Sequence, residues 1–136
     1  MRQVFDSFAG FDDFLAYLGV SLALLALFEA IYIRVTPYRE IALIRAGNMA
    51  ASFSLSGALL GFIVPLASAV QHSVGLADML IWGVIAMAVQ LLTFVAVKLL
   101  IPSITLDIPA DKGAQGFFLG ALSLGVGLLN AACMSY

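Results

Sequence analysis

Few polar side chains interrupt the long apolar stretches of this chain, and Glu29 is the only one of them that carries a formal charge. It lies about 6 Å inside the end of the first stretch, counted as helix. A carboxylate at that depth in lipid is costly unless it meets water, a cation or a proton, so Glu29 could bind a proton or a cation. The alternative hypothesis is an ion pair with a basic residue expected at the same depth: Arg34, Lys98 or Arg45.

Uncharged polar residues form a second group, with Gln90 in the middle of the third apolar stretch and Asn130 toward the end of the fourth. In lipid, such side chains commonly hydrogen-bond one helix to another, and we favour that interpretation. The alternative is a polar path with its outer mouth around Ser68, His72 and Asn130. His72 has no second His or Cys nearby in sequence, which favours an interfacial side chain over a metal ligand.

Composition decides the environment in which these residues act. The chain has 136 residues, of which 63% are hydrophobic and 10% charged, with a mean hydropathy of +1.11. A soluble domain carries about a quarter charged residues, so this chain lacks the polar surface it would need in water. The single cysteine, Cys133, excludes an internal disulfide; it is either a small apolar residue or a thiol that reacts with a second copy.

Four apolar runs are long enough to span a bilayer. They are Phe14–Ile33, Met49–Val70, Met79–Val97 and Ala114–Met134. We therefore predict an all-α membrane protein, a single integral membrane domain over residues 1–136 with four transmembrane helices. A short helix over Tyr38–Ala46, with Thr36 as its N-cap, combines apolar and charged residues and is expected to lie on the cytoplasmic membrane surface.

The second span has an unusual content of small residues. Asn48 is a good N-cap for it, and Pro65 inside it cannot donate a backbone hydrogen bond, which leaves the Gly61 carbonyl unpaired and predicts a kink. Small residues four apart let helix backbones approach closely. The predicted packing positions on the second and fourth spans are Ser52, Ser56, Gly57, Gly61, Gly116, Gly120 and Gly125.

The two halves of the chain resemble each other at a shift of 64 or 65 residues. The shift pairs Arg34 with Lys98 and Pro37 with Pro102, which predicts repeat units of about 13–75 and 76–136, two tandem hairpins of the same orientation. Five of the six basic residues fall in or beside the loops after spans one and three. The positive-inside rule places those loops in the cytoplasm and both termini outside.

No motif for soluble chemistry is present. The sequence has no phosphate-binding loop, no dinucleotide fingerprint, no metal-ligand spacing and no nucleophile next to a histidine. It also lacks a basic patch of the kind that binds nucleic acid. We therefore predict that the protein is not an enzyme and holds no cofactor or metal. Its expected partners are the lipid bilayer and other protein chains, not nucleic acid.

Several segments resemble the bacterial inner-membrane family called domain of unknown function 350. The resemblance covers nearly the whole chain, and its residues are Thr36-Pro37-Tyr38 with Glu40, Gly47-Asn48, Ala50-Ala51-Ser52 through Ser56-Gly57, Leu60-Gly61-Phe62, Pro65-Leu66-Ala67-Ser68 and Asn130-Ala131-Ala132-Cys133-Met134. It implies a four-helix protein of the inner (plasma) membrane. It brings no activity and no catalytic residues.

Two functions fit these features. The favoured one is an accessory or structural membrane component, a homo-oligomer and most simply a dimer, that recruits a cytoplasmic partner through Tyr38–Ala46. The alternative is a small channel or transporter for a cation or small solute, with Glu29 as its carboxylate and Gln90 and Asn130 along the route.

Overall fold

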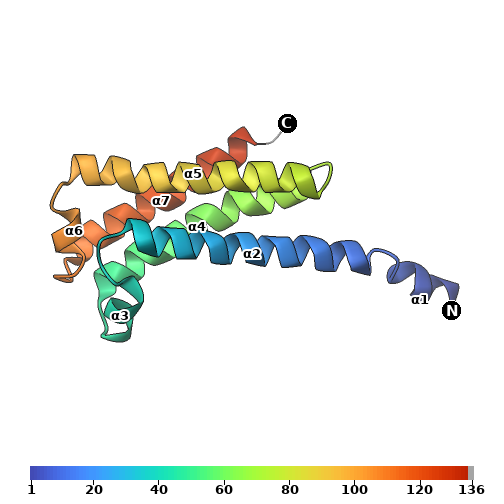
Figure 1. Cartoon of the computed structure of the whole chain (residues 1–136), viewed down its shortest axis with the longest axis horizontal. Helices are drawn as coiled ribbons and strands as arrows, with labels where there is room; N and C mark the ends of the chain where they lie inside the picture. The colour runs from blue at the N-terminus through green and yellow to red at the C-terminus, as the bar shows by residue number, and fades with distance from the viewer. Residues whose placement is uncertain (135–136) are drawn as a thin grey trace.

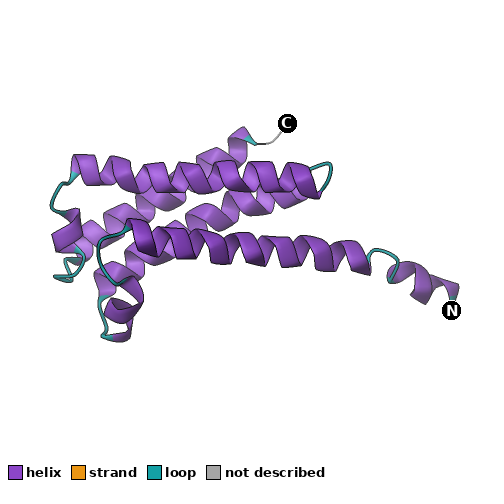
Figure 2. Cartoon of the chain, in the orientation of Figure 1, coloured by secondary structure: helices purple, strands orange, loops and turns teal. Residues whose placement is uncertain are grey.

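The computed structural model describes residues 1–134, and every regular element in that range is a helix (Figures 1 and 2). Four helices are long and apolar enough to cross a membrane, which confirms the prediction of four spans. They are α2 (Phe11–Val35), α4 (Met49–His72), α5 (Leu76–Leu100) and α7 (Gly113–Cys133). Three short helices accompany them: α1 (Arg2–Ser7), α3 (Glu40–Arg45) and α6 (Ile104–Asp107).

The long helices alternate in direction. Figure 1 shows α2 and α5 running one way and α4 and α7 the other, with α3 and α6 at one end of the bundle. The N-terminus and the end of α7 lie at the opposite end. Two tandem hairpins would give this arrangement, and the internal repeat itself stays a prediction.

The closest helix contact joins α4 to α7. A Cβ atom added at any of five glycines on these helices would collide with the facing helix: Gly57, Gly61, Gly116, Gly120 and Gly127. We call this contact the glycine seam. Because the backbones nearly touch, dispersion contacts along the whole seam stabilise the pair in lipid, where no hydrophobic force acts between helices.

The remaining predicted packing positions lie outside the glycine seam. Ser56 is exposed and Ser52 is only half-buried, while Ser54 is fully buried. Gly125 has no neighbouring atom within 4 Å of where its Cβ would be, and Gly127 makes the contact in its place. The spacing of small residues therefore identified the two helices and four of the seam positions, Gly57, Gly61, Gly116 and Gly120, but not Ser52, Ser56 or Gly125.

Aromatic side chains hold the second half of α2 against the bundle. The Phe28 ring stacks on Phe62 of α4 at a centroid distance of 4.6 Å, and Tyr32 meets Phe94 of α5 edge-on at 5.8 Å. Phe28 and Phe62 are both fully buried. The first half of α2 is largely exposed, and Figure 1 shows it diverging from the bundle toward α1.

The start of α4 is fixed by two capping side chains. The Asn48 side-chain oxygen accepts a hydrogen bond from the Ala51 amide at 2.8 Å, which confirms the predicted N-cap. Its amide nitrogen donates to the Ile108 carbonyl at 2.9 Å, and Asp111 accepts from the Ala50 amide at 3.0 Å. The loop before α7 is therefore bound to the N-terminus of α4, where a carboxylate also complements the helix dipole.

The short helix after α2 differs from the prediction. It covers Glu40–Arg45 instead of Tyr38–Ala46, and Thr36 is the C-cap of α2, not the N-cap of α3. The Thr36 hydroxyl donates to the Tyr32 carbonyl at 3.2 Å, and its backbone is extended, as expected for a residue before proline. The turn at Thr36 and Pro37 therefore separates α2 from α3, and α3 packs against α4.

Candidate functional site

The structure places the predicted polar residues in three separate regions. Glu29 lies near the end of α2 that faces α3. Gln90 lies in the middle of α5 and is buried at the centre of the bundle. Ser68, His72 and Asn130 lie toward the ends of α4 and α7, at the side of the two chain termini. These residues do not form one continuous site.

Gln90 links three helices. Its side-chain nitrogen donates to the Gly61 carbonyl of α4 and to the Ser123 carbonyl of α7, both at 3.0 Å. The Gly61 carbonyl is the group that Pro65 deprives of its helical partner, so Gln90 supplies the missing donor. Only the side-chain oxygen of Gln90 stays without a partner. The geometry gives Gln90 a structural task at the glycine seam.

The group near the termini is small and local. The Ser68 hydroxyl donates to the Ala131 carbonyl of α7 at 3.3 Å, and His72 Nδ1 lies 2.9 Å from the Ser68 carbonyl of its own helix. The Asn130 amide nitrogen is buried without a hydrogen-bond partner. Only the Ser68 hydrogen bond joins α4 to α7. Among residues 1–134 no group of three or more His, Cys, Asp or Glu side chains could hold a metal ion.

The most unusual polar group lies around the turn between α2 and α3, and we call it the acidic cluster: Glu29, Tyr32, Tyr38 and Glu40. Tyr32 and Glu40 are each 1% exposed, and Tyr38 is 8% exposed. Five of their oxygens are buried without a hydrogen-bond partner: Glu29 Oε2, the two tyrosine hydroxyls and both carboxyl oxygens of Glu40. Buried polar atoms in folded proteins are almost always hydrogen-bonded, so this concentration requires an explanation.

The members of the acidic cluster interact electrostatically. Tyr32 interacts with Glu40, Tyr38 and Glu29, and Glu40 also interacts with Glu29. Burial, followed by the Glu40 charge, raises the pKa of Tyr38, and the nearby Ser54 side chain partly offsets this. Within the cluster the Glu29 charge therefore hinders the ionisation of Glu40, and the Glu40 charge hinders that of Tyr38.

Glu40 is the most perturbed carboxyl outside the spans. Burial raises its pKa to about 7, with a smaller increase from the Glu29 charge and a decrease from the Thr36 side chain. The Thr36 hydroxyl proton is directed to the carbonyls of Tyr32 and Ile33, at 3.2 and 3.4 Å. It therefore does not fully stabilise the charged carboxylate.

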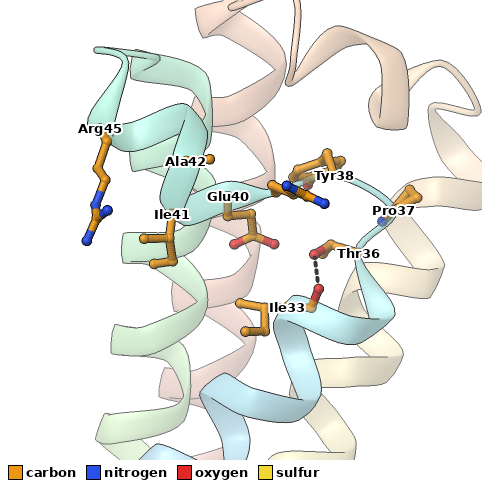
Figure 3. A pocket seen from close by; sticks show the side chains of 9 residues that line it. Ile33, Thr36, Pro37, Tyr38, Glu40, Ile41, Ala42 and Arg45 are labelled. Carbon is orange, nitrogen blue, oxygen red and sulfur yellow. Dashed lines mark hydrogen bonds between the residues drawn. The ribbon is translucent and has the colours of Figure 1, made fainter.

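No cationic side chain neutralises the acidic cluster. In the described part of the chain the only ion pair is that of Lys112 with Asp107, at 3.3 Å. The ion pair that the sequence offered for Glu29, with Arg34, Lys98 or Arg45, is therefore absent from the described residues. Figure 3 shows the Arg45 side chain pointing away from the Glu40 carboxylate.

A pocket of about 680 Å³ leads to this corner (Figure 3). It is lined by two segments, the end of α2 with the following turn and the first part of α3, comprising Ile33, Thr36, Pro37, Tyr38, Arg39, Glu40, Ile41, Ala42 and Arg45. In Figure 3 the Glu40 carboxylate points inward, toward Thr36 and the end of α2. The pocket gives the surface a path to a buried acidic group.

Sequence reasoning found Glu29 but missed Tyr32, Tyr38 and Glu40 as site residues. It treated Glu40 only as one of the charged residues of a short helix on the membrane surface. In the structure Glu40 is buried, while Ile41 and Ala42 of the same helix are exposed. One available signal was composition, because Glu29 and Glu40 are the only two glutamates in the chain and flank the same turn.

Comparison with known proteins identifies the family. The model of the family described as Domain of Unknown Function (DUF350) matches residues 6–134. The chain belongs to this family. The UPF0719 inner membrane protein YjfL of Escherichia coli K12 is 39% identical to it over 134 residues, which is 98% of this chain and 99% of the relative.

A more distant relative comes from a different bacterium. The UPF0719 transmembrane protein YshE of Bacillus subtilis is 31% identical over 123 residues, covering 86% of this chain and 89% of its own length. No solved structure matches. Membership of the DUF350 family, together with four apolar helices, makes this chain an all-helical membrane protein.

Proposed function

We propose that this protein is an inner-membrane channel or transporter subunit for a small cation, with the acidic cluster as its binding site. The observation that carries this proposal is the Glu40 carboxyl group, buried beside Glu29 with no hydrogen bond to either oxygen and no ion pair. A buried carboxylate is tolerated only with a counter-ion or a proton. Oxygen ligands also suit hard cations.

A second copy of the chain is part of the proposal. The centre of the single bundle is filled by the glycine seam and by fully buried rings such as Phe28 and Phe62, which leaves no room for a route within one chain. In contrast, only 11% of the most apolar part of α2 is buried. We therefore place the route between chains of a homo-oligomer, most simply a dimer, in which α2 faces the partner copy.

The proposed orientation puts the acidic cluster at the cytoplasmic face. The basic residues gather at the end of the bundle that holds α3 and α6: Arg34, Arg39, Arg45, Lys98 and Lys112. The positive-inside rule then places this end in the cytoplasm and both termini outside. The proposed inner-membrane location follows the name of the Escherichia coli relative.

Flux through proteoliposomes tests the proposal. Purified wild-type protein, Glu40→Gln and Glu29→Gln are reconstituted at equal density, and proton, Na⁺ and K⁺ fluxes are recorded under an imposed gradient. We expect wild-type flux for at least one of these cations and at least a tenfold loss in both variants. Asp13→Asn, which removes an exposed carboxylate far from the cluster, is the matched control and keeps its flux. Equal flux for all four proteins would remove the acidic cluster from the function.

The accessory role is the second candidate, and the exposure of α3 supports it. Arg39 and Arg45 are both exposed, without an ion pair among the described residues, at the surface that we place in the cytoplasm. Charge reversal at both positions is expected to abolish recovery of a cytoplasmic partner while membrane insertion stays normal. Unchanged recovery would count against this role, and it leaves the flux experiment unaffected.

A further inference from the structure

The number and chemistry of the groups in the acidic cluster limit what can bind there. We propose that Glu29 and Glu40 together hold one exchangeable proton, so that the ligand of the cluster is H⁺ and not a metal cation or an organic ammonium ion. This inference rests on the proposed function and deepens it, since it names the cation.

Burial excludes larger ligands. Glu40 is 1% exposed, which leaves no room for a hydrated ion or an ammonium group against its carboxyl oxygens. A metal ion would need several oxygen ligands, and the described residues offer no group of three or more His, Cys, Asp or Glu side chains. A proton needs one oxygen and no space.

Hydrogen-bond chemistry also favours a single proton. Two ionised carboxylates only accept hydrogen bonds, and placed together in a poorly solvated site they repel each other. Binding of one proton converts one carboxylate into a carboxylic acid, with no oxidation or reduction. The acid can then donate a hydrogen bond, and the hydroxyls of Tyr32 and Tyr38, otherwise unpartnered, can donate or accept one. A shared proton therefore relieves both the repulsion and the missing hydrogen bonds.

The charged and titratable side chains around this corner could in principle replace the proton, and they come from four segments. α2 contributes Glu29, Tyr32 and, in its last turn, Arg34; the turn and α3 contribute Tyr38, Arg39, Glu40 and Arg45. α4 contributes Ser54, because its only titratable side chain, His72, lies at the other end of the bundle. α5 contributes only Lys98, in its last turn. None of these cations forms an ion pair with Glu29 or Glu40 among the described residues.

The pocket supplies a path for the proton. Tyr38 and Glu40 are both part of its lining, and Arg39 and Arg45 lie exposed around it. A hydroxyl such as that of Tyr38 can both accept and donate a proton, so it can relay one from the pocket to the buried carboxyls without opening the site. A proton can reach the buried carboxyl groups by transfer through a hydroxyl group, whereas a metal or ammonium ion would need an open passage.

Selective labelling makes the test direct, since the two glutamates of the cluster are the only glutamates in the chain. The full-length protein is produced with glutamate carrying ¹³C at the side-chain carboxyl carbon and is titrated by NMR in detergent micelles. We expect two carboxyl resonances that shift together, with one step near neutral pH. Glu40→Gln should abolish that step, and Glu29→Gln should move it to lower pH, because the like charge is gone.

Cation additions complete the experiment. At a fixed pH near neutrality, neither Na⁺, K⁺ nor methylammonium should shift the two resonances, and Asp13→Asn should leave the titration unchanged. Resonances that titrate only in the ordinary acidic range, or that respond to Na⁺, K⁺ or methylammonium, would overturn the proton site. If the step near neutral pH is present but no cation flux is measured, the proposed function is wrong and the proton site stands. If both the flux and the resonances depend on Na⁺, the proposed function stands and the assignment of the ligand as a proton is wrong.

Discussion

The glycine seam and the acidic cluster treat buried polar groups in opposite ways. At the seam, the carbonyl that Pro65 leaves unpaired receives a donor from Gln90, and the helices approach until their backbones touch. At the cluster, both carboxyl oxygens of Glu40 and the Tyr32 hydroxyl have no partner. The polar groups at the seam are therefore paired and stabilise the bundle, whereas those at the cluster are left without partners. Unpaired buried polar groups are expected at a site that binds a ligand.

The largest expected effect is at the seam itself. Gly120→Ala places a methyl group against the backbone of Phe53 on α4, and the rigid backbone cannot move away. We expect a loss of about 3 kcal/mol or more in the free energy of unfolding, at the upper end of overpacking effects. Gly125→Ala is the matched control, since open space surrounds that position, and it should be neutral or slightly stabilising. Equal losses in the two variants, measured by denaturant titration in detergent, would show that the seam is not tightly packed.

The next prediction concerns the repair of the proline defect. Gln90→Leu removes the donor to the Gly61 and Ser123 carbonyls, and we expect a loss of about 2 kcal/mol. Pro65→Ala restores the backbone N–H, so the same Gln90→Leu change should be less harmful in that background. A double-mutant cycle measures the coupling. Strict additivity of the two substitutions would mean that Gln90 does not compensate for Pro65.

The acidic cluster should respond in the opposite direction. Glu40 has its pKa raised from 4.5 to about 7 by folding, so the native state binds the proton more tightly than the unfolded state. Stability is therefore fully present below about pH 4.5 and decreases as the pH rises toward 7, after which it is constant. Glu40→Gln should remove this slope and gain on the order of 1 kcal/mol at pH 8. A variant that is less stable than wild type at pH 8 would indicate a hidden counter-ion.

The smallest effect is expected at the cap that joins the two loops. Asn48→Ala removes the acceptor for the Ala51 amide and the donor to the Ile108 carbonyl, and it should lower the free energy of unfolding by about 1 kcal/mol. Asn48→Asp is the informative companion, because it keeps the acceptor and loses the donor. If the aspartate variant is as stable as wild type, the contact to the loop contributes little.

Local sequence features predicted the helices but not their neighbours. Four apolar runs, the Asn48 cap and the unpaired Gly61 carbonyl follow from hydropathy, hydrogen-bonding chemistry and the missing proline N–H. The same reasoning described the segment after the first span as a surface helix that combines apolar and charged residues, Glu40 among them. Nothing local indicated that the carboxyl group of Glu40 is buried beside the turn at Thr36 and Pro37.

Residue types and their spacing were enough to predict a membrane protein with four apolar helices. Two of these helices are rich in small residues, and one of them contains Pro65. Those properties depend on residue type and spacing along one chain segment. The packing of the helices determines that Gln90 donates to the Gly61 carbonyl and that Glu29 and Glu40 belong to one cluster. A lost backbone donor or a charge in an apolar stretch can be read from the sequence. The group that compensates for it lies on another helix, and its position depends on how the helices pack.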